Sequence, residues 1–216
     1  MKGLLLKDFY QLIKYCRSFF IIDVIFIGVS LFVDGAEMFV YFPIIFSAIL
    51  PMTLLSYDER SGWMEYSGTL PYSANQIVSA KYLFGLIVQT VTASVVIGVE
   101  FVSRAIYNAG GLDMASDIFI KNLLLIGIMF VVSLLCPAIC IPFCFKFGTE
   151  KGRIAYFVII ALLAAVCMSL YNKYGDQIQL LSKNYSWVLL PILGGIAVLY
   201  VVSWIASIPL LRSVKK

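Results

Sequence analysis

The sequence predicts an all-α integral membrane protein, and its composition and patterning are the observations behind this prediction. Of its 216 residues, 62% are apolar and 13% are charged, whereas soluble domains are about half apolar and about a quarter charged. The apolar residues fall in several separate runs, and a backbone in lipid must satisfy its own hydrogen bonds by forming helices. We therefore expect one membrane domain that takes up residues 1–216, with no room for a soluble catalytic domain.

Six apolar runs are candidates for transmembrane helices, because a span needs about 20 residues, with a range of about 17 to 25. The first run follows a basic stretch and lacks a small-residue cleavage site, so we expect a retained helix rather than a cleaved signal peptide. The predicted spans cover approximately residues 18–33, 38–55, 82–103, 119–144, 155–171 and 187–210.

The segment before the first span, residues 4–17, has the periodicity of an amphipathic helix. A basic amphipathic helix next to a span is typical of the cytoplasmic interface, where it lies flat on the membrane. The alternative is a simple extension of the first span. The predicted apolar face consists of Leu5, Leu6, Phe9, Leu12, Ile13 and Cys16, and the predicted polar face of Lys7, Asp8, Gln11 and Lys14.

The basic residues predict the orientation of the chain. The N-terminal segment, the loops at 56–81 and 145–154 and the C-terminal tail together hold 12 of the 16 Lys and Arg residues. By the positive-inside rule, both termini and the 56–81 loop are cytoplasmic. An even number of spans agrees with this orientation.

The 56–81 loop is long and polar for a connection between two membrane helices. Tyr57 to Tyr66 is predicted to be a short helix, and acidic residues near its start suit the helix dipole. Leu70 and Pro71 break the chain, because proline disfavours helix in the residue before it. Ser73 and Gln76 form a capping box that begins a new helix leading into the third span.

This layout would present the first loop helix to the cytosol. Large aromatic anchors within a polar rim are typical of interaction hot spots. The alternative is that Trp63 and Tyr66 anchor the loop among lipid headgroups, as aromatic belts do. The candidate binding residues are Tyr57, Glu59, Arg60, Trp63, Met64, Glu65 and Tyr66.

Two acidic residues lie within predicted spans, where an acid is by default a candidate functional residue. Glu100 is four residues before Arg104, which is a common spacing for a helical ion pair. Asp23 has no basic residue at a suitable spacing. It would face a dimer interface, a solvated cavity or the headgroup region.

Several function classes are disfavoured by residues that the chain lacks. It has no His, which is the commonest general base and neutral metal ligand, and its charge does not form a nucleic-acid-binding patch. Cys136, Cys140 and Cys144 share a helix face, but small buried Cys is common, and Pro137 and Pro142 distort that helix; no metal site is predicted. There is also no phosphate-binding loop of the GxxxxGK[ST] type.

The loop resembles that of type-2 ATP-binding-cassette exporter permeases, in particular small six-helix bacterial permeases of peptides and toxins. The stretch Lys2 to Asp8 also resembles the interfacial helix of this family. The chain departs from the family pattern at Ala74, where relatives often have a basic residue. The loop positions that match the family motif are Glu59, Arg60, Gly62 and Glu65, then Leu70, Pro71 and Ser73, then Lys81.

The resemblance implies a function for the loop and a set of partners. The first loop helix would be the coupling helix that sits in a cleft of a separate cytoplasmic ATPase, which would bind ATP and Mg²⁺; this chain would bind no cofactor. A second copy of the chain would complete the transporter in the cytoplasmic membrane of a bacterium, with lipid around it. Relatives imply an exported amphipathic or hydrophobic substrate, such as a peptide, moving between the two copies along spans 1, 2 and 5.

Two other function classes are weighed against an exporter permease. An intramembrane enzyme would need a nucleophile and base, and the chain offers no such set. A stand-alone small membrane protein, for instance an immunity or regulatory factor, remains the alternative. Such a protein would not need a structured loop rich in anchors.

Overall fold

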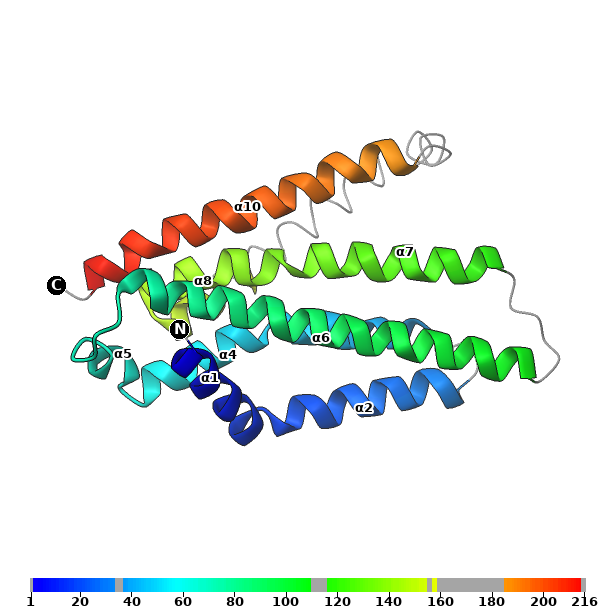
Figure 1. The fold of residues 1–216 in the computed structure, drawn as a ribbon, viewed down its shortest axis with the longest axis horizontal. Helices are drawn as coiled ribbons and strands as arrows, with labels where there is room; N and C mark the ends of the chain where they lie inside the picture. Colours follow the sequence, from blue (N-terminus) through cyan, green and yellow to red (C-terminus); the bar gives the residue numbers. More distant parts are fainter. Residues whose placement is uncertain (1, 34–36, 110–115, 155–156, 159–184, 215–216) are drawn as a thin grey trace.

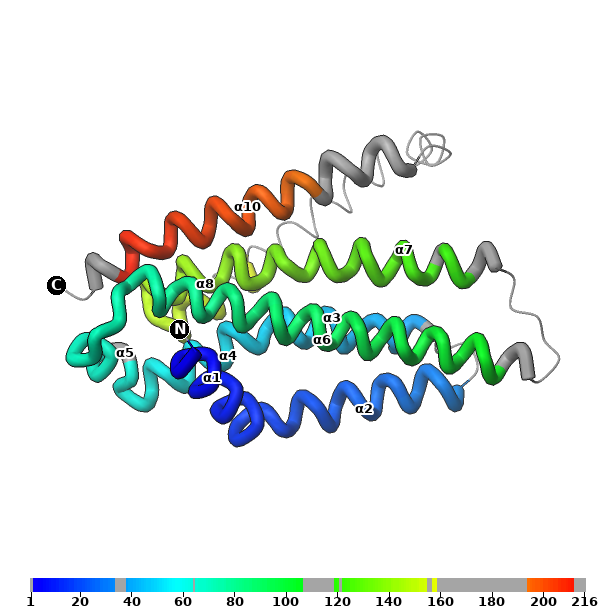
Figure 2. The backbone as a smooth tube through the Cα atoms, in the orientation of Figure 1, coloured from blue at the N-terminus to red at the C-terminus, as the bar shows by residue number. Residues whose placement is uncertain are grey.

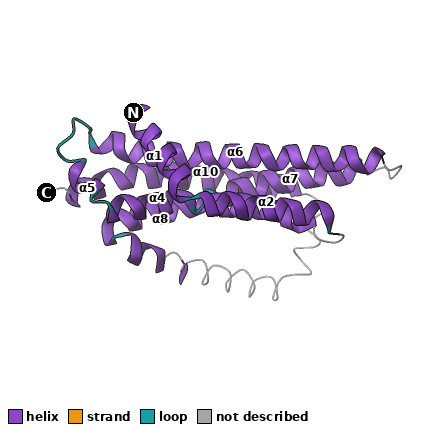
Figure 3. Cartoon of the chain, turned by 90° about the horizontal axis from the view of Figure 1, so that it is seen from below, coloured by secondary structure: helices purple, strands orange, loops and turns teal. Residues whose placement is uncertain are grey.

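The computed structural model describes residues 2–33, 37–109, 116–154, 157–158 and 185–214, and all regular structure among them is helical. The helices run roughly side by side, except for two short elements at one end of the bundle, α1 and α5 (Figures 1 and 3). The bounds are α1 Lys2–Tyr15, α2 Arg17–Phe32, η1 Glu37–Tyr41, α3 Phe42–Ser47, α4 Leu50–Arg60, α5 Trp63–Tyr66, α6 Ala74–Ala109, α7 Ser116–Ser133, α8 Leu135–Phe147 and α10 Tyr185–Val214.

Four of the described segments are long and apolar enough to cross a membrane, and a fifth is added if the bent pair of α1 and α2 counts as one span. The structure therefore confirms a helical, multi-span protein. Of the six predicted spans, the fifth, at 155–171, falls almost entirely outside the described residues. The four segments are Met38–Arg60, Ala74–Ile106, Asn122–Phe147 and Gly194–Leu211.

The predicted N-terminal helix is a separate element, because α1 and α2 meet at an angle of 67°. Cys16 lies at the bend and is fully buried. The Arg17 Nε donates a hydrogen bond of 3.0 Å to the carbonyl of Ile13, and a basic side chain of this kind satisfies a carbonyl left free at a helix end. The bend therefore changes the chain direction between two helices that are both well formed.

Two predicted spans are each divided by a break that precedes a proline. Span 38–55 is interrupted between α3 and α4, shortly before Pro51, and span 119–144 is interrupted between α7 and α8, shortly before Pro137. Proline has no N–H to give to the carbonyl four residues earlier, so the regular ladder cannot continue through this point. The predicted distortion of the fourth span is confirmed, with Pro142 inside α8.

The core near α1 and α5 is built by α4, α6, α8 and α10. The Tyr82 hydroxyl of α6 lies 2.7 Å from the Ser203 hydroxyl and 2.9 Å from the Ser207 hydroxyl of α10. The Tyr200 hydroxyl donates to the Tyr82 carbonyl at 2.9 Å. These hydrogen bonds join α6 to α10 inside an apolar core; the polar loop leads into the start of α6 (Figure 2).

The capping box at the start of α6 is confirmed. The Ser73 hydroxyl accepts from the Gln76 N–H at 3.3 Å, and the Gln76 side-chain oxygen accepts from the Ser73 N–H at 3.2 Å. The Ser73 N–H gains an acceptor in this way, and the Gln76 N–H is shared between the Ser73 hydroxyl and the Ser73 carbonyl, 3.0 Å away.

We expect Ser73→Ala to cost about 0.5–2 kcal/mol of local stability, because the first turn of α6 loses its cap. Hydrogen exchange at the amides of residues 74–77 should become faster. The matched control is Ser94→Ala, whose exposed hydroxyl bonds only to the Thr90 carbonyl within the same helix. Equal exchange in the two variants would show that the cap does not hold this helix start.

Candidate functional site

The polar loop begins with a helical break that the sequence did not predict. The expected helix from Tyr57 to Tyr66 is wrong as one element, because Tyr57–Arg60 is the last turn of α4 and only Trp63–Tyr66 forms α5. Gly62 separates them with φ of 68°, a left-handed conformation that glycine adopts without the penalty paid by other residues. The loop therefore consists of the end of α4, a sharp turn and one isolated helical turn.

The outer side of this turn is exposed at the end of the bundle where α1 also lies (Figure 1). Tyr66 is 58% exposed, and Arg60 and Glu65 are also exposed. Trp63 is half-buried and packs against the core, with its ring centroid 5.8 Å from that of Tyr66. Met64 belongs to α5, but its side chain lies outside the described part. The surface that can meet a partner is thus smaller than predicted.

A group of four charged side chains lies beneath the turn; three of them are almost closed to solvent, and the fourth, Lys7, is partly exposed. Asp58 is 0% exposed, Asp8 1% and Lys81 4%. The Lys81 Nζ lies 2.7 Å from the Asp8 Oδ1 and 2.6 Å from the Asp58 Oδ2. We call these three residues and Lys7 the charge cluster. It joins α1, α4 and α6, which are far apart in the sequence.

Lys7 completes the charge cluster from α1. Its ammonium group donates to the Asp58 Oδ1 and lies 3.4 Å from the Asp8 Oδ1. It also lies 4.4 Å from the centroid of the Trp63 ring, in a cation–π contact that ties α5 to α1. Burial lowers the pKa of Lys7, and the nearby positive charge of Lys81 lowers it further.

These contacts correct the predicted faces of α1. Asp8 and Lys7 were expected on a polar face away from the apolar one, but both turn toward Asp58 and Lys81. On the predicted apolar face, Leu6, Phe9 and Ile13 are exposed, whereas Leu12 and Cys16 are buried. The prediction failed because it assumed that charge faces solvent, whereas opposite charges on α4 and α6 compensate these charges inside the protein.

Glu59 is exposed, and its carboxylate, unlike that of Asp58, contacts the segment that follows α8. Its Oε2 accepts from the backbone N–H of Thr149 at 2.7 Å. Thr149 is the first residue of a helical turn, so the carboxylate caps a helix N-terminus, where negative charge is favoured. Gly148 precedes it with φ of 85°, and a Cβ there would lie 3.0 Å from Glu59 Oε1.

Tyr57 also has an internal neighbour. Its ring stacks on that of Tyr15 at the end of α1, with 4.6 Å between the centroids and 20° between the planes. The last turn of α4 is therefore in contact with α1 through both Tyr57 and Asp58. Tyr57 belongs to the support of the loop more than to its outer surface.

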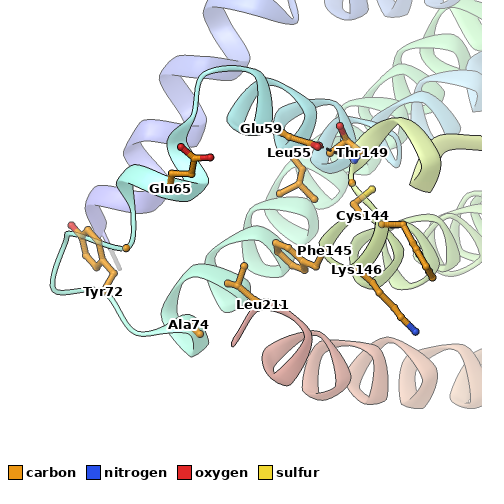
Figure 4. A pocket seen from close by; sticks show the side chains of 13 residues that line it. Leu55, Glu59, Glu65, Tyr72, Ala74, Cys144, Phe145, Lys146, Thr149 and Leu211 are labelled. Atoms are coloured by element: carbon orange, nitrogen blue, oxygen red, sulfur yellow. Dashed lines mark hydrogen bonds between the residues drawn. The ribbon is translucent and has the colours of Figure 1, made fainter. Parts of the chain in front are cut away.

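A cleft of about 740 Å³ opens between the loop and the ends of α8 and α10. Glu59 and Glu65 line it from one side, and Cys144 and Phe145 from the other (Figure 4). Leu211 of α10 also lines it. The cleft places two acidic side chains beside an apolar wall, next to the exposed turn.

The two predicted intramembrane acids lie on α6 and α2. Glu100 accepts a hydrogen bond of 3.4 Å from the Asn122 amide, and Arg104 lies 4.6 Å from the centroid of the Phe119 ring, so each has a neighbour on α7. Asp23 is half-buried in α2, and its Oδ1 has no hydrogen-bond partner among the described residues. The three cysteines of α8 are buried in the apolar core.

The charge cluster is the part of the site that sequence reasoning missed. Asp8 was assigned to a solvated face, and Asp58 only to a helix start. The available signal was the position of Asp8, Asp58 and Lys81 in or beside apolar segments, where each charge needs a partner. Thr149 gave no signal, because it contributes only its backbone N–H.

Apolar spans together with a charged loop held at one end of the bundle define a polytopic membrane protein with a fixed polar surface. The family model of ABC-2 family transporter proteins matches residues 3–212, nearly the whole chain, and the chain belongs to this family. It is a membrane-embedded transporter permease rather than an enzyme, and its family generally pairs with an ATP-binding-cassette ATPase and dimerises. Comparisons with curated proteins and with solved structures gave no match.

Proposed function

We propose that this chain is the membrane half of an ATP-driven exporter and that a separate ATPase docks on the turn formed by the end of α4 and α5. The observation that carries the proposal is the exposed surface of Arg60, Glu65 and Tyr66, which is held from beneath by buried ion pairs. A surface meant to transmit force must not yield when a partner presses on it. The charge cluster supplies that stiffness.

The orientation of the chain in the membrane is inferred from the basic residues at the end of the bundle that carries the docking turn. The α1 helix, α5 and the end of α10 all lie there (Figure 1), and this end carries most of the basic residues. By the positive-inside rule it is cytoplasmic, which places both termini and the docking turn on the side where an ATPase has access to ATP and Mg²⁺. The exposed Leu6, Phe9 and Ile13 of α1 then face lipid at the cytoplasmic membrane of a bacterium.

Two copies of the chain would form the transport pathway, with an amphipathic or hydrophobic substrate, such as a peptide, moving between them. The α2 helix supports this arrangement because none of its side chains is buried within the single chain. It carries Asp23, whose Oδ1 lacks a partner among the described residues. A second copy would supply neighbours for this helix.

The docking surface is tested by Tyr66→Ala and Glu65→Gln in a chain co-expressed with the ATPase encoded beside it. We expect each change to weaken association about 5- to 30-fold, as for a typical contact residue at an interface. Neither should change membrane insertion, since both side chains are exposed. Affinity purification through a tag on the ATPase, followed by titration, measures the loss.

The control is Tyr10→Ala, because Tyr10 is similarly exposed at 64% but lies on α1. It should bind the ATPase as the unchanged chain does. Normal binding by both loop variants would place the docking surface elsewhere. Absence of any association, with ATPase activity indifferent to this chain, would favour a stand-alone membrane protein with an immunity or regulatory role.

A further inference from the structure

Asp58 and Glu59 are neighbours in the sequence, but they connect the end of α4 to different parts of the molecule. Successive residues of a helix are about 100° apart around its axis, with 3.6 residues per turn. Asp58 contacts Lys7 of α1 and Lys81 of α6, and Glu59 contacts the backbone of Thr149. Asp58 lies four residues and Glu59 three residues before Gly62, which lies in the docking turn.

The connection through Asp58 leads to the first membrane helix. Asp58 holds Lys7, and Lys7 and Asp8 are on α1, which continues through the bend at Cys16 into α2. No side chain of α2 is fully buried, and the helix contacts the rest of the described bundle through the Phe26 ring, which stacks on Phe39, Phe42 and Phe46. A displacement of α1 would therefore move α2 against this aromatic contact.

The connection through Glu59 leads to the helical segment that starts at Thr149. Gly148 has φ of 85°, and a Cβ at Gly152 would lie 2.7 Å from the Cys144 Sγ. The absence of side chains at these two positions lets residues 148–152 lie directly against Glu59 and α8. A displacement of Glu59 is transmitted to this segment through the direct hydrogen bond from the Thr149 N–H.

We propose that Asp58 and Glu59 are positioning residues that divide the movement of the docking turn into two branches. The Asp58 branch moves α1 and α2, and the Glu59 branch moves the segment beginning at Thr149. This inference rests on the proposed function, in which an ATPase acts on the turn. It assigns to two adjacent acids a role in transmission rather than in binding the ATPase.

Two variants separate the branches without leaving a buried charge unpaired. The double variant Lys7→Gln/Asp8→Asn removes one charge of each sign from α1 and keeps the pair between Asp58 and Lys81. Glu59→Ala removes the acceptor of the Thr149 N–H, whereas Glu59→Gln keeps an oxygen that can accept it. Ser94→Ala is the control, because Ser94 is exposed on α6 and lies outside the docking turn, the charge cluster and the contact of Glu59.

The experiment is hydrogen exchange on the complex with the co-expressed ATPase in lipid nanodiscs, with and without Mg·ATP. In the unchanged chain, ATP should alter exchange in both α2 and residues 149–154. Lys7→Gln/Asp8→Asn should abolish only the response of α2, and Glu59→Ala only that of residues 149–154, with Glu59→Gln restoring it. If one variant abolishes the ATP response of both segments, or if neither variant abolishes a response, the movement of the docking turn is not divided into two branches.

The chain without the ATPase distinguishes this inference from the proposed function. Glu59→Ala should speed exchange of the Thr149 amide about three- to tenfold, the effect of losing one hydrogen bond, with α1 unchanged. Lys7→Gln/Asp8→Asn should speed exchange in α1 with Thr149 unchanged. If no ATPase binds but these results hold, the two branches exist and the proposed function fails; if exchange changes in both places together, the two branches do not exist.

Discussion

Replacing Lys81 with methionine should destabilise the protein by about 3–5 kcal/mol, the usual cost of removing one partner from a buried ion pair. Lys81 is 4% exposed and lies within 2.7 Å of carboxylate oxygens of both Asp8 and Asp58. Without it, two buried carboxylates share the single ammonium group of Lys7. Reversible unfolding by SDS in mixed micelles, followed by tryptophan fluorescence, measures the loss.

A charge-balanced variant tests the cause. Lys81→Met/Asp8→Leu removes one charge of each sign and keeps the pair between Lys7 and Asp58. Buried ion pairs replaced by apolar residues of similar size are often neutral in stability, so the double variant should be more stable than Lys81→Met alone. Lys151→Met, at an exposed position, should have little effect. A double variant as unstable as the sum of its two single changes would show that the cluster does not act as one unit.

Replacing Gly152 with alanine should destabilise the protein by about 1–3 kcal/mol, because there is no room for a methyl group. A Cβ at Gly152 would lie 2.7 Å from the Cys144 Sγ and 3.1 Å from the Cys144 backbone nitrogen. The segment that begins at Thr149 and contains Gly152 would have to move away from α8. The Thr149 N–H, which donates to Glu59, would move with it. The same SDS unfolding measures the change, and exchange at Thr149 reports the local shift.

The matched control is Gly98→Ala in α6, because no atom lies within 4 Å of a Cβ placed there. This change should be neutral or should stabilise the helix by up to about 1 kcal/mol, the difference in helix propensity. Adding Cys144→Ala to Gly152→Ala should restore only part of the loss, since the backbone contact remains. Equal stability of Gly152→Ala and Gly98→Ala would contradict the close packing of this segment.

The individual residues show why part of the site was predictable. Ser73 and Gln76 interact with the backbone of the same helix start, so their spacing in the sequence was sufficient. Pro137 acts on the hydrogen-bonding ladder of its own helix, and the break before it was likewise predictable. Gly62 was predicted to be part of the family motif. Its φ of 68° and the end of α4 just before it were not predicted.

The residues that were misjudged all have partners far away in the sequence. Asp8 pairs with a lysine 73 positions later, and Glu59 with a backbone group 90 positions later. Periodicity places such residues on a face of their own helix and assigns charge to the solvent side. It cannot show that a second helix brings an opposite charge to the same face.

The sequence by itself determined that this is a helical membrane protein, where its polar loop lies and how α6 begins. These properties depend on hydrophobicity and on contacts between residues a few positions apart. Only the tertiary structure decided that α1 turns its charges inward and that Asp58 and Glu59 face different helices. The physical reason is that a buried charge loses its hydration and is tolerated only where other segments bring opposite charges into contact with it, and this depends on how the helices pack.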